Sequence, residues 1–484
     1  MDPALPTPEG TRWPYPTRRG GVVTPPQASL SPDRSSLRRR LILGGGWALS
    51  AKIVAALISL AVNAMLARML SPRELGAYYL AFSTVILGAS IGELGLGRAA
   101  VRLVAESSAR HATWQTRTLV RRLLQLCLAG ALAVFILYTA AGRVLSNHVL
   151  RAPALDAIVV LISFWMGATV VQRVITEIFR GFSDIRIASV LGQSPDGPVP
   201  AAILSCCLTI LLVLDVGGVD YAVTASVLSA LATVGLGTLL LVGTVRTLPR
   251  KAEPTRSDVS RGGHLSILSI SVPMLVTNVT AFALSFQSDL WLLGIFRAQE
   301  EVALYGAAAR LLFLINAPLM VINAVVPPTV AALNIEGRRV TLERLLRGTA
   351  TLGGFAALGT FLIFAVLGGS ILSLLFGAYY RAAAHLLVIL GIGQVVHVAS
   401  GSCTLALLMT GHEKAMMKIS ITMTALAVAF GIFAAALVGV IGMAYVSAGR
   451  LILQNVVTIL AVKRLLGVRT YVDLSLRSLQ ALRS

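Results

Sequence analysis

Residues 41–66 read LILGGGWALSAKIVAALISLAVNAML, and a second apolar stretch runs from residue 75 to residue 97. Each stretch reaches the roughly 20 apolar residues that a helix needs to cross a hydrocarbon core about 30 Å thick. Core helices of soluble proteins are usually shorter and present a polar face to water. The sequence therefore predicts two membrane-spanning helices here, and these two set the pattern for the rest of the chain.

The composition of the whole chain agrees with this interpretation. Of its 484 residues, 56% are hydrophobic and 13% are charged, which is too little charge for the surface of a soluble protein of this length. Each apolar block must be helical because backbone polar groups find no water inside a bilayer. We predict an all-α polytopic membrane protein with twelve spans, at residues 41–66, 75–97, 121–141, 154–176, 187–214, 219–243, 265–288, 302–328, 349–375, 385–410, 419–438 and 441–462.

The basic residues indicate how the chain crosses the membrane. The formal net charge is +20, which in a soluble protein would suggest nucleic acid binding. Here the Arg and Lys residues lie mainly between apolar blocks, and loops rich in them alternate with loops that hold few. The positive-inside rule places the basic loops and both termini in the cytoplasm, which an even number of spans satisfies. We therefore expect the protein to be surrounded by membrane lipids and not to bind nucleic acid.

The spans fall into two sets of six that look like copies of each other. Residues 74–81 read ELGAYYLA and residues 301–308 read EVALYGAA, at the start of the second and eighth spans. Six spans per copy leave both copies in one orientation, which is a parallel repeat. The predicted parts are a disordered cytoplasmic tail (1–40), a six-helix bundle (41–243), a cytoplasmic linker (244–264), a second six-helix bundle (265–465) and a cytoplasmic tail (466–484).

No motif in the sequence predicts a metal or a cofactor. The four cysteines all lie in apolar blocks without metal-type spacing, so they are expected to be small buried hydrophobic residues. The glycine-rich stretches at 44–46 and 92–97 lack the preceding strand and following Lys-Ser/Thr of a phosphate-binding loop. Any driving force for transport is therefore expected to come from an ion gradient, the membrane potential or a substrate gradient.

Several short motifs carry a resemblance to a known family. They are ARMLSPRELGAY at 67–78, GELGLG at 92–97, DLWLLG at 289–294, YGAAARL at 305–311, the two prolines at 327–328, LGIGQ at 390–394 and MTGHE at 409–413. In this order and spacing they resemble the polysaccharide transporter (Wzx-like) family of the multidrug/oligosaccharidyl-lipid/polysaccharide flippase superfamily. The resemblance covers roughly residues 40–465.

The resemblance implies two six-helix bundles in a V shape around a central cavity. It also implies a flippase, not an enzyme, in the bacterial cytoplasmic (inner) membrane. Its substrate would be an oligosaccharide on an undecaprenyl-pyrophosphate carrier, moved from the inner to the outer leaflet for assembly of a surface polysaccharide such as O-antigen or exopolysaccharide. Polysaccharide polymerases or glycosyltransferases are the expected protein partners.

A bare pyrophosphate and sugar cannot cross hydrocarbon at an acceptable cost, so the carrier needs a polar, cationic cavity. Basic residues inside spans are costly and usually face a cavity or a partner. Lys52 in the first span, Arg310 in the eighth and Arg450 in the twelfth are therefore the predicted substrate cavity. The alternatives are ion pairs with buried acids, or side chains that extend to the interface.

Two acids are predicted to act in gating or ion coupling. Glu93 lies in the cytoplasmic third of the second span, and Asp196 lies within QSPDGPVP at residues 193–200, which interrupts the fifth span. Prolines and glycine at this density kink or unwind a helix, and transporters place sites at broken helices. The alternatives for Asp196 are an internal ion pair with a buried basic residue, a simple kink, or a span boundary that lies elsewhere.

Other functions compete with the flippase. An ion-coupled exporter of small cations or drugs from the same superfamily often uses an acid in the first span, whereas this span carries Lys52. A major-facilitator transporter would show a Gly-Asp-Arg-Gly pattern after the second span, and a polymerase or ligase would need a large outer loop; neither is present. The related lipid II flippases usually have two further spans.

Overall fold

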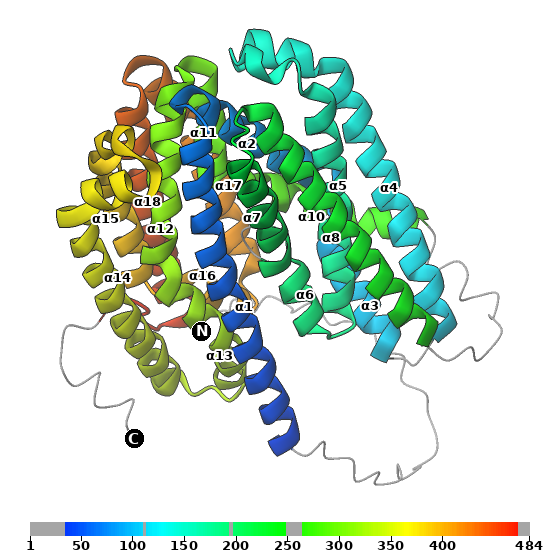
Figure 1. The fold of residues 1–484 in the computed structure, drawn as a ribbon. Coiled ribbons are helices and arrows are strands. Elements are labelled where there is room, and N and C mark those ends of the chain that lie inside the picture. The colour runs from blue at the N-terminus through cyan, green and yellow to red at the C-terminus, as the bar shows by residue number, and fades with distance from the viewer. Residues whose placement is uncertain (1–33, 110–112, 193–196, 248–263, 473–484) are drawn as a thin grey trace, which may run out of the picture. The chain divides into compact units, whose positions relative to one another are not determined.

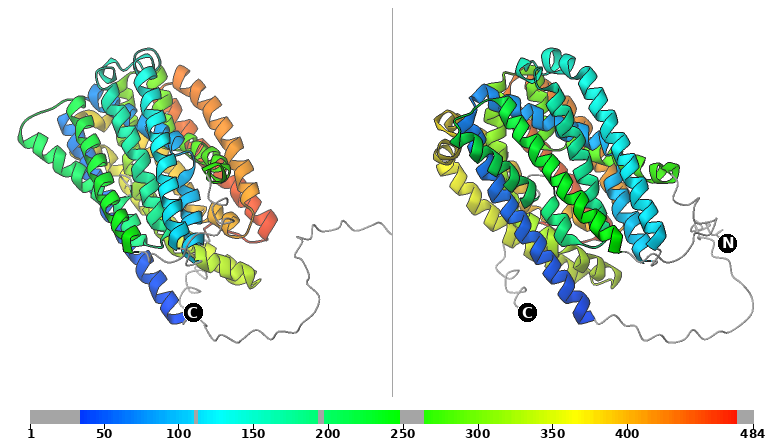
Figure 2. Two further views of the ribbon diagram at one scale, coloured as in Figure 1. Left: turned by 90° about the vertical axis from the view of Figure 1, so that its right-hand side faces the viewer. Right: turned by 45° about the vertical axis from the view of Figure 1, so that its right-hand side comes forward.

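The computed structural model describes residues 34–109, 113–192, 197–247 and 264–472 (Figure 1). The chain divides into two compact units, Met1–Leu41 and Ile42–Ser484. The pockets and contacts discussed below lie in the second unit, whose long helices run side by side in both views of Figure 2. Most of the predicted first tail, linker and last tail lies outside the described residues, so these boundaries remain predictions. Residues 34–40, which were predicted to be disordered, are helical and form the start of α1.

The helices of the first half of the chain are α1 (Arg34–Met69), α2 (Pro72–Gly92), α3 (Leu96–Ala109), α4 (Thr113–Val144), α5 (Val159–Gly181), α6 (Ile185–Leu191), α7 (Pro198–Val213) and α8 (Val219–Thr247). A π-helical turn (Leu145–Val149) and a 3-10 turn (Pro153–Leu155) join α4 to α5.

The second half contains α10 (His264–Ala283), α11 (Phe286–Phe296), α12 (Gln299–Val325), α13 (Pro327–Ile335), α14 (Arg339–Phe376), α15 (Ala384–Ala399), α16 (Cys403–Met409), α17 (Glu413–Leu437) and α18 (Val440–Leu466). A 3-10 turn (Ala378–Ala383) precedes α15.

The all-α prediction with about twelve spans is confirmed for the described residues. Eleven helical segments are long and apolar enough to cross a membrane, and α7 adds a shorter apolar helix. Some helices outrun the predicted spans: α14 begins at Arg339, ten residues before the predicted start at 349. At 1.5 Å per residue its 38 residues are about 57 Å long, well beyond a hydrocarbon core. Hydropathy marks only the part of a helix that lies in lipid.

Several predicted spans are divided into shorter helices, among them the second and the seventh. The second span breaks between α2 and α3, where Leu94 (φ 51°) and Gly95 (φ 72°) adopt left-handed conformations. The prediction of one helix at 265–288 was wrong, because α10 ends at Ala283 and α11 continues to Phe296. Ser285 starts α11 by accepting a hydrogen bond from the Gln287 N–H, which gives the new helix a cap in mid-span.

The start of the second span is fixed by its sequence. The Ser71 side chain accepts from the Glu74 N–H at 3.3 Å, and the Glu74 carboxylate accepts from the Ser71 N–H at 2.9 Å. This is a capping box, with Pro72 in the first turn where no backbone donor is needed. The motif at residues 74–81 thus marks a helix start, as predicted.

The two halves repeat one packing contact. Tyr78, in the ELGAYYLA motif of α2, shares a 2.9 Å hydrogen bond with Ser226 of α8. Tyr305, in the EVALYGAA motif of α12, donates a hydrogen bond to Ser447 of α18 at 3.1 Å. In each half, therefore, the same tyrosine position joins the second span to the sixth, which supports the parallel repeat.

The halves meet where α2 packs on α12. A side chain at Gly76 would collide with the Gln299 carbonyl, and one at Gly306 would collide with the Tyr79 ring. Glycine is therefore required for this close approach of the backbones. The Trp291 indole N–H of α11 also donates to the Thr84 hydroxyl of α2 at 3.1 Å, so the halves are joined by both apolar and polar contacts.

Candidate functional site: a basic cavity and a separate arginine pocket

A cavity with charged walls has a volume of about 600 Å³ and lies among α1, α2, α3, α5, α6, α10 and α11. We call it the basic cavity. Helices of both halves form its walls, because α10 and α11 belong to the second half. Its ionisable lining residues are four basic and two acidic side chains: Lys52, Glu93, Arg98, Arg173, Glu177 and Arg180.

One face of α5 supplies three of these side chains. Arg173, Glu177 and Arg180 are four and three residues apart, so helix geometry places them on neighbouring turns of one face. Arg180 forms an ion pair with Glu177 at 2.5 Å. Arg173 lies 3.8 Å from the Glu93 carboxylate and donates a hydrogen bond to the Ser90 hydroxyl at 3.0 Å. The acids of the cavity therefore neutralise the arginines of α5 in part.

The break between α2 and α3 brings Glu93 into this wall. Glu93 is 7% exposed, and its carboxylate accepts from the Gly97 N–H at 3.0 Å. A Cβ at Gly97 would collide with this carboxylate and lie 3.2 Å from Glu177. Two glycines of the GELGLG motif therefore have different structural roles. Gly95 allows the chain to turn, and Gly97 leaves room for two carboxylates.

Three cations of the cavity are exposed, and Arg180 among them is paired with Glu177; the other two are Lys52 and Arg98. Neither forms an ion pair with any described residue. A basic excess in a cleft with apolar walls focuses a positive potential on the space between them. Phosphate oxygens are suitable ligands, because charge-assisted hydrogen bonds to phosphate are among the strongest that a protein makes. The basic cavity can thus bind an anion.

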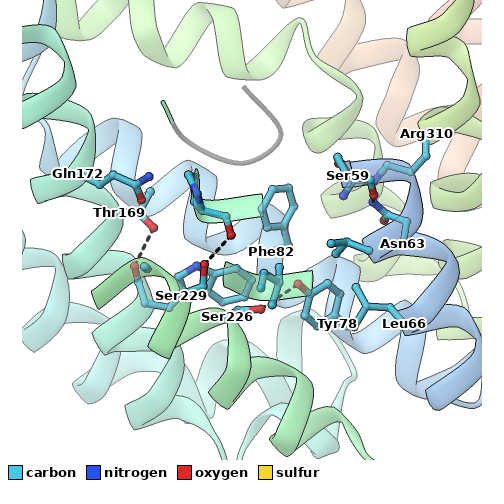
Figure 3. Close-up of a pocket in the computed structure, with 15 residues that line it drawn as sticks. Ser59, Asn63, Leu66, Tyr78, Phe82, Thr169, Gln172, Ser226, Ser229 and Arg310 are labelled. Atoms are coloured by element: carbon cyan, nitrogen blue, oxygen red, sulfur yellow. Dashed lines mark hydrogen bonds between the residues drawn. The ribbon is translucent and has the colours of Figure 1, made fainter. Parts of the chain in front are cut away.

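Arg310 lies in a different place, the Arg310 pocket (Figure 3). This pocket of about 50 Å³ is lined by polar residues from α1, α2, α5 and α8, including Ser59, Asn63 and Gln172. The Arg310 guanidinium sits 5.3 Å from the Tyr79 ring centre and 5.1 Å from that of Phe82. These distances are typical of cation–π contacts.

A neighbouring pocket of about 160 Å³ opens between α1 and α12 and shares Ser59, Asn63 and Arg310 with the first. Its remaining walls are apolar and include Leu60 and Phe313. No Asp or Glu lines either pocket among the described residues, so Arg310 is held by aromatic rings and not by an acid.

Arg450 differs from the expectation that it lines the cavity. It lines none of the three pockets described above and lies 3.6 Å from the Asp289 carboxylate, with the two side chains 7% and 3% exposed. Asp289 also accepts from the Tyr305 hydroxyl at 2.8 Å and from the Ser447 hydroxyl. A buried guanidinium without a counter-charge would be far more costly than this pair, which explains why the two side chains meet.

The structure thus separates the predicted site residues. Lys52 and Glu93 share the basic cavity, Arg310 lies in its own pocket, and Arg450 is in an ion pair. Asp196 falls outside the described residues. The site residues predicted from the sequence did not include Arg98, Arg173, Glu177 and Arg180. The spacing of the three charges on α5 was the signal that could have identified them.

Comparison with known proteins is consistent with the fold. A model of the family described as "Polysaccharide biosynthesis protein" matches residues 41–334. The comparison with curated protein sequences gives no match.

Three solved structures illustrate the likeness. An inward-facing multidrug resistance MATE family transporter of the MOP superfamily has a TM-score of 0.70 and 16% identity, covering 87% of this chain and 97% of that one. The lipid II flippase MurJ, in an inward closed conformation, has a TM-score of 0.65 and 12% identity, covering 85% and 86%. A MOP superfamily transporter from Pyrococcus furiosus has a TM-score of 0.59 and 14% identity, covering 88% and 95%. The chain therefore belongs to the polysaccharide biosynthesis protein family and is a multi-pass membrane protein with the fold of the MOP superfamily transporters.

Proposed function

We propose that this protein is a flippase that moves an undecaprenyl-pyrophosphate-linked oligosaccharide from the inner to the outer leaflet of a bacterial cytoplasmic membrane, with both termini in the cytoplasm. The basic cavity is the observation that carries the proposal. Its walls come from both halves, so a relative movement of the halves changes access to it, as alternating access requires.

The chemistry of the cavity matches a sugar diphosphate. Lys52 and Arg98 are cations without ion pairs among the described residues, and a diphosphate brings the missing negative charge. Uncharged polar side chains at Thr176, Asn278 and Gln287 also line the cavity. The buried Gln287 Oε1 has no hydrogen-bond partner among the described residues. Hydroxyl groups of a sugar are suitable donors to such an acceptor.

The pocket between α1 and α12 fits the lipid part of the same substrate. Its apolar wall includes Leu57, which is 58% exposed and faces outward. A polyprenyl chain could remain in lipid along this surface while the polar head is inside the protein. Arg310, at the junction of the polar and apolar pockets, is proposed to contact the phosphates at a different stage from Lys52.

Glu93 is proposed to couple the cavity to a gate or an ion. It lies between Arg173 and the Gly97 N–H at the break of the second span. A diphosphate that binds Arg173 competes with the Glu93 carboxylate, which would then need another partner, a proton included. Contacts with a polymerase or glycosyltransferases also belong to the proposal.

The second candidate is an ion-coupled exporter of small molecules. The likeness to MATE transporters favours it, because the fold is shared. The excess of basic over acidic residues in the cavity opposes it for cationic drugs, since like charges repel in a low-dielectric cleft.

Transport in proteoliposomes distinguishes the two candidates. A fluorescent polyprenyl-diphosphate oligosaccharide is placed in the membrane, and a membrane-impermeant quencher reports how much reaches the other leaflet. Protein-dependent equilibration of this lipid, with no efflux of ethidium, is expected. Ion-driven ethidium efflux without lipid movement would overturn the flippase and favour the exporter.

A further inference from the structure

The seventh span is built from two helices with different neighbours. Both α10 and α11 contact α2 and α17, but α10 also packs on α3 and α4, whereas α11 also packs on α12 and α18. The contact of α10 with the first half is close: a side chain at Gly95 would collide with the Ser271 carbonyl. The His264 ring also lies 3.2 Å from the Gln125 side chain of α4. The joint between α10 and α11 therefore connects the two halves.

Arg450 of α18 spans this joint. One guanidinium nitrogen donates to the carbonyl of Ala283, the last residue of α10, at 3.3 Å. The same nitrogen lies 3.6 Å from the carboxylate of Asp289, in the first turn of α11. A cation at a helix C-terminus and an acid at a helix N-terminus both interact favourably with the helix dipole. A single side chain thus holds the ends of both helices.

The first half of the chain has no ion pair at the matching place among its described residues. Its first span, α1, is one continuous helix from Arg34 to Met69. The first half keeps the contact between Tyr78 and Ser226. The hydrogen bond from its second span to its first span is instead made by the next residue, Tyr79, whose hydroxyl donates to the Asn63 amide oxygen at 3.2 Å. The acceptor is therefore an uncharged amide and not a carboxylate. The buried charged pair therefore occurs in the half whose first span is broken.

We propose that Arg450 and Asp289 form a hinge clasp, a positioning pair that fixes the angle between α10 and α11 and so holds α10 as a wall of the basic cavity. α10 contributes Asn278 and Phe282 to that wall. Release of the clasp frees α10 to move away from α3 and opens the cavity on that side. The clasp concerns the movement of α10 and holds for any ligand of the cavity.

The test measures α10 directly in the full-length protein. The four native cysteines are replaced, and Ser271, fully buried against α3, is changed to Cys as a reporter. A water-soluble maleimide then labels this cysteine at a rate set by the opening of α10. A second protein carries the reporter at Ser163, which is equally buried in α5 and far from the joint in sequence.

Arg450→Gln and Asp289→Asn are expected to raise the labelling rate at residue 271 about tenfold, because each leaves the joint with one charge and no counter-charge. Labelling at residue 163 should not change. Arg450→Lys should give an intermediate rate, since an ammonium keeps the charge but lacks the rigid, planar geometry of the guanidinium group.

If the single variants do not fold, the double variant Asp289→Asn with Arg450→Met removes both charges and should still label faster at residue 271. An unchanged rate at residue 271 in folded variants would overturn the clasp. An equal rise at residues 271 and 163 would also overturn it, because general destabilisation would then explain the labelling.

Discussion

The Asp289–Arg450 cluster and the basic cavity use the same kinds of side chain in opposite ways. In the cluster one acid meets one guanidinium, two hydroxyls complete the acid's hydrogen bonds, and both charges are almost fully buried. In the cavity four basic residues face two acids, and Lys52 and Arg98 are exposed. A balanced pair stabilises a structure, whereas an unbalanced set around open space is suited to bind a ligand.

The largest effect expected from this contrast is on stability. Arg450→Gln should lower the free energy of unfolding by about 3–5 kcal/mol, because it leaves the Asp289 carboxylate buried without its counter-charge. Lys52→Gln should leave it nearly unchanged, since an exposed side chain loses little on substitution. Thermal denaturation of the detergent-purified proteins measures both. Equal losses of stability in the two variants would contradict the claim that the Asp289–Arg450 cluster stabilises the fold and that Lys52 does not.

A smaller effect is expected from the acids of the cavity. Glu93→Gln removes a carboxylate that competes with an anionic ligand for Arg173 and keeps a side chain of the same size. The affinity for a polyprenyl diphosphate should rise several-fold, by an amount comparable to one charge-assisted hydrogen bond. Titration in nanodiscs measures it, with Glu106→Gln, a surface residue paired to Arg102 at 2.9 Å, as the matched control. A lower affinity in Glu93→Gln alone would mean that Glu93 supports the site instead of competing for it.

The fold was predictable because a bilayer leaves few choices. Apolar blocks long enough to span it must be helices, and the ELGAYYLA and EVALYGAA motifs indicated the repeat through Tyr78 and Tyr305. Helix ends outside the lipid, such as the start of α14 at Arg339, were missed because hydropathy does not report them.

The site was harder to predict. Arg173 and Arg450 look alike in sequence, since each is a single arginine in an apolar span. Their environments differ because Asp289 meets Arg450 only through folding, and a sequence does not show which helix a side chain faces. Lys52 and Glu93 were predicted because each is a charged residue within an apolar span. Arg173, Glu177 and Arg180 of α5 could have been predicted only from their spacing of four and three residues.

The most direct test of the basic cavity as the binding site is an affinity measurement. A polyprenyl-diphosphate sugar is titrated into nanodiscs that contain the protein, the Lys52→Ala/Arg98→Ala variant, or the Arg102→Ala variant, which removes a surface cation outside the cavity. We predict that removing the two cavity cations weakens binding by about 10- to 100-fold without lowering thermal stability, and that Arg102→Ala binds as the natural protein does. Unchanged affinity in a folded Lys52→Ala/Arg98→Ala variant would contradict the assignment of the anion site to this cavity.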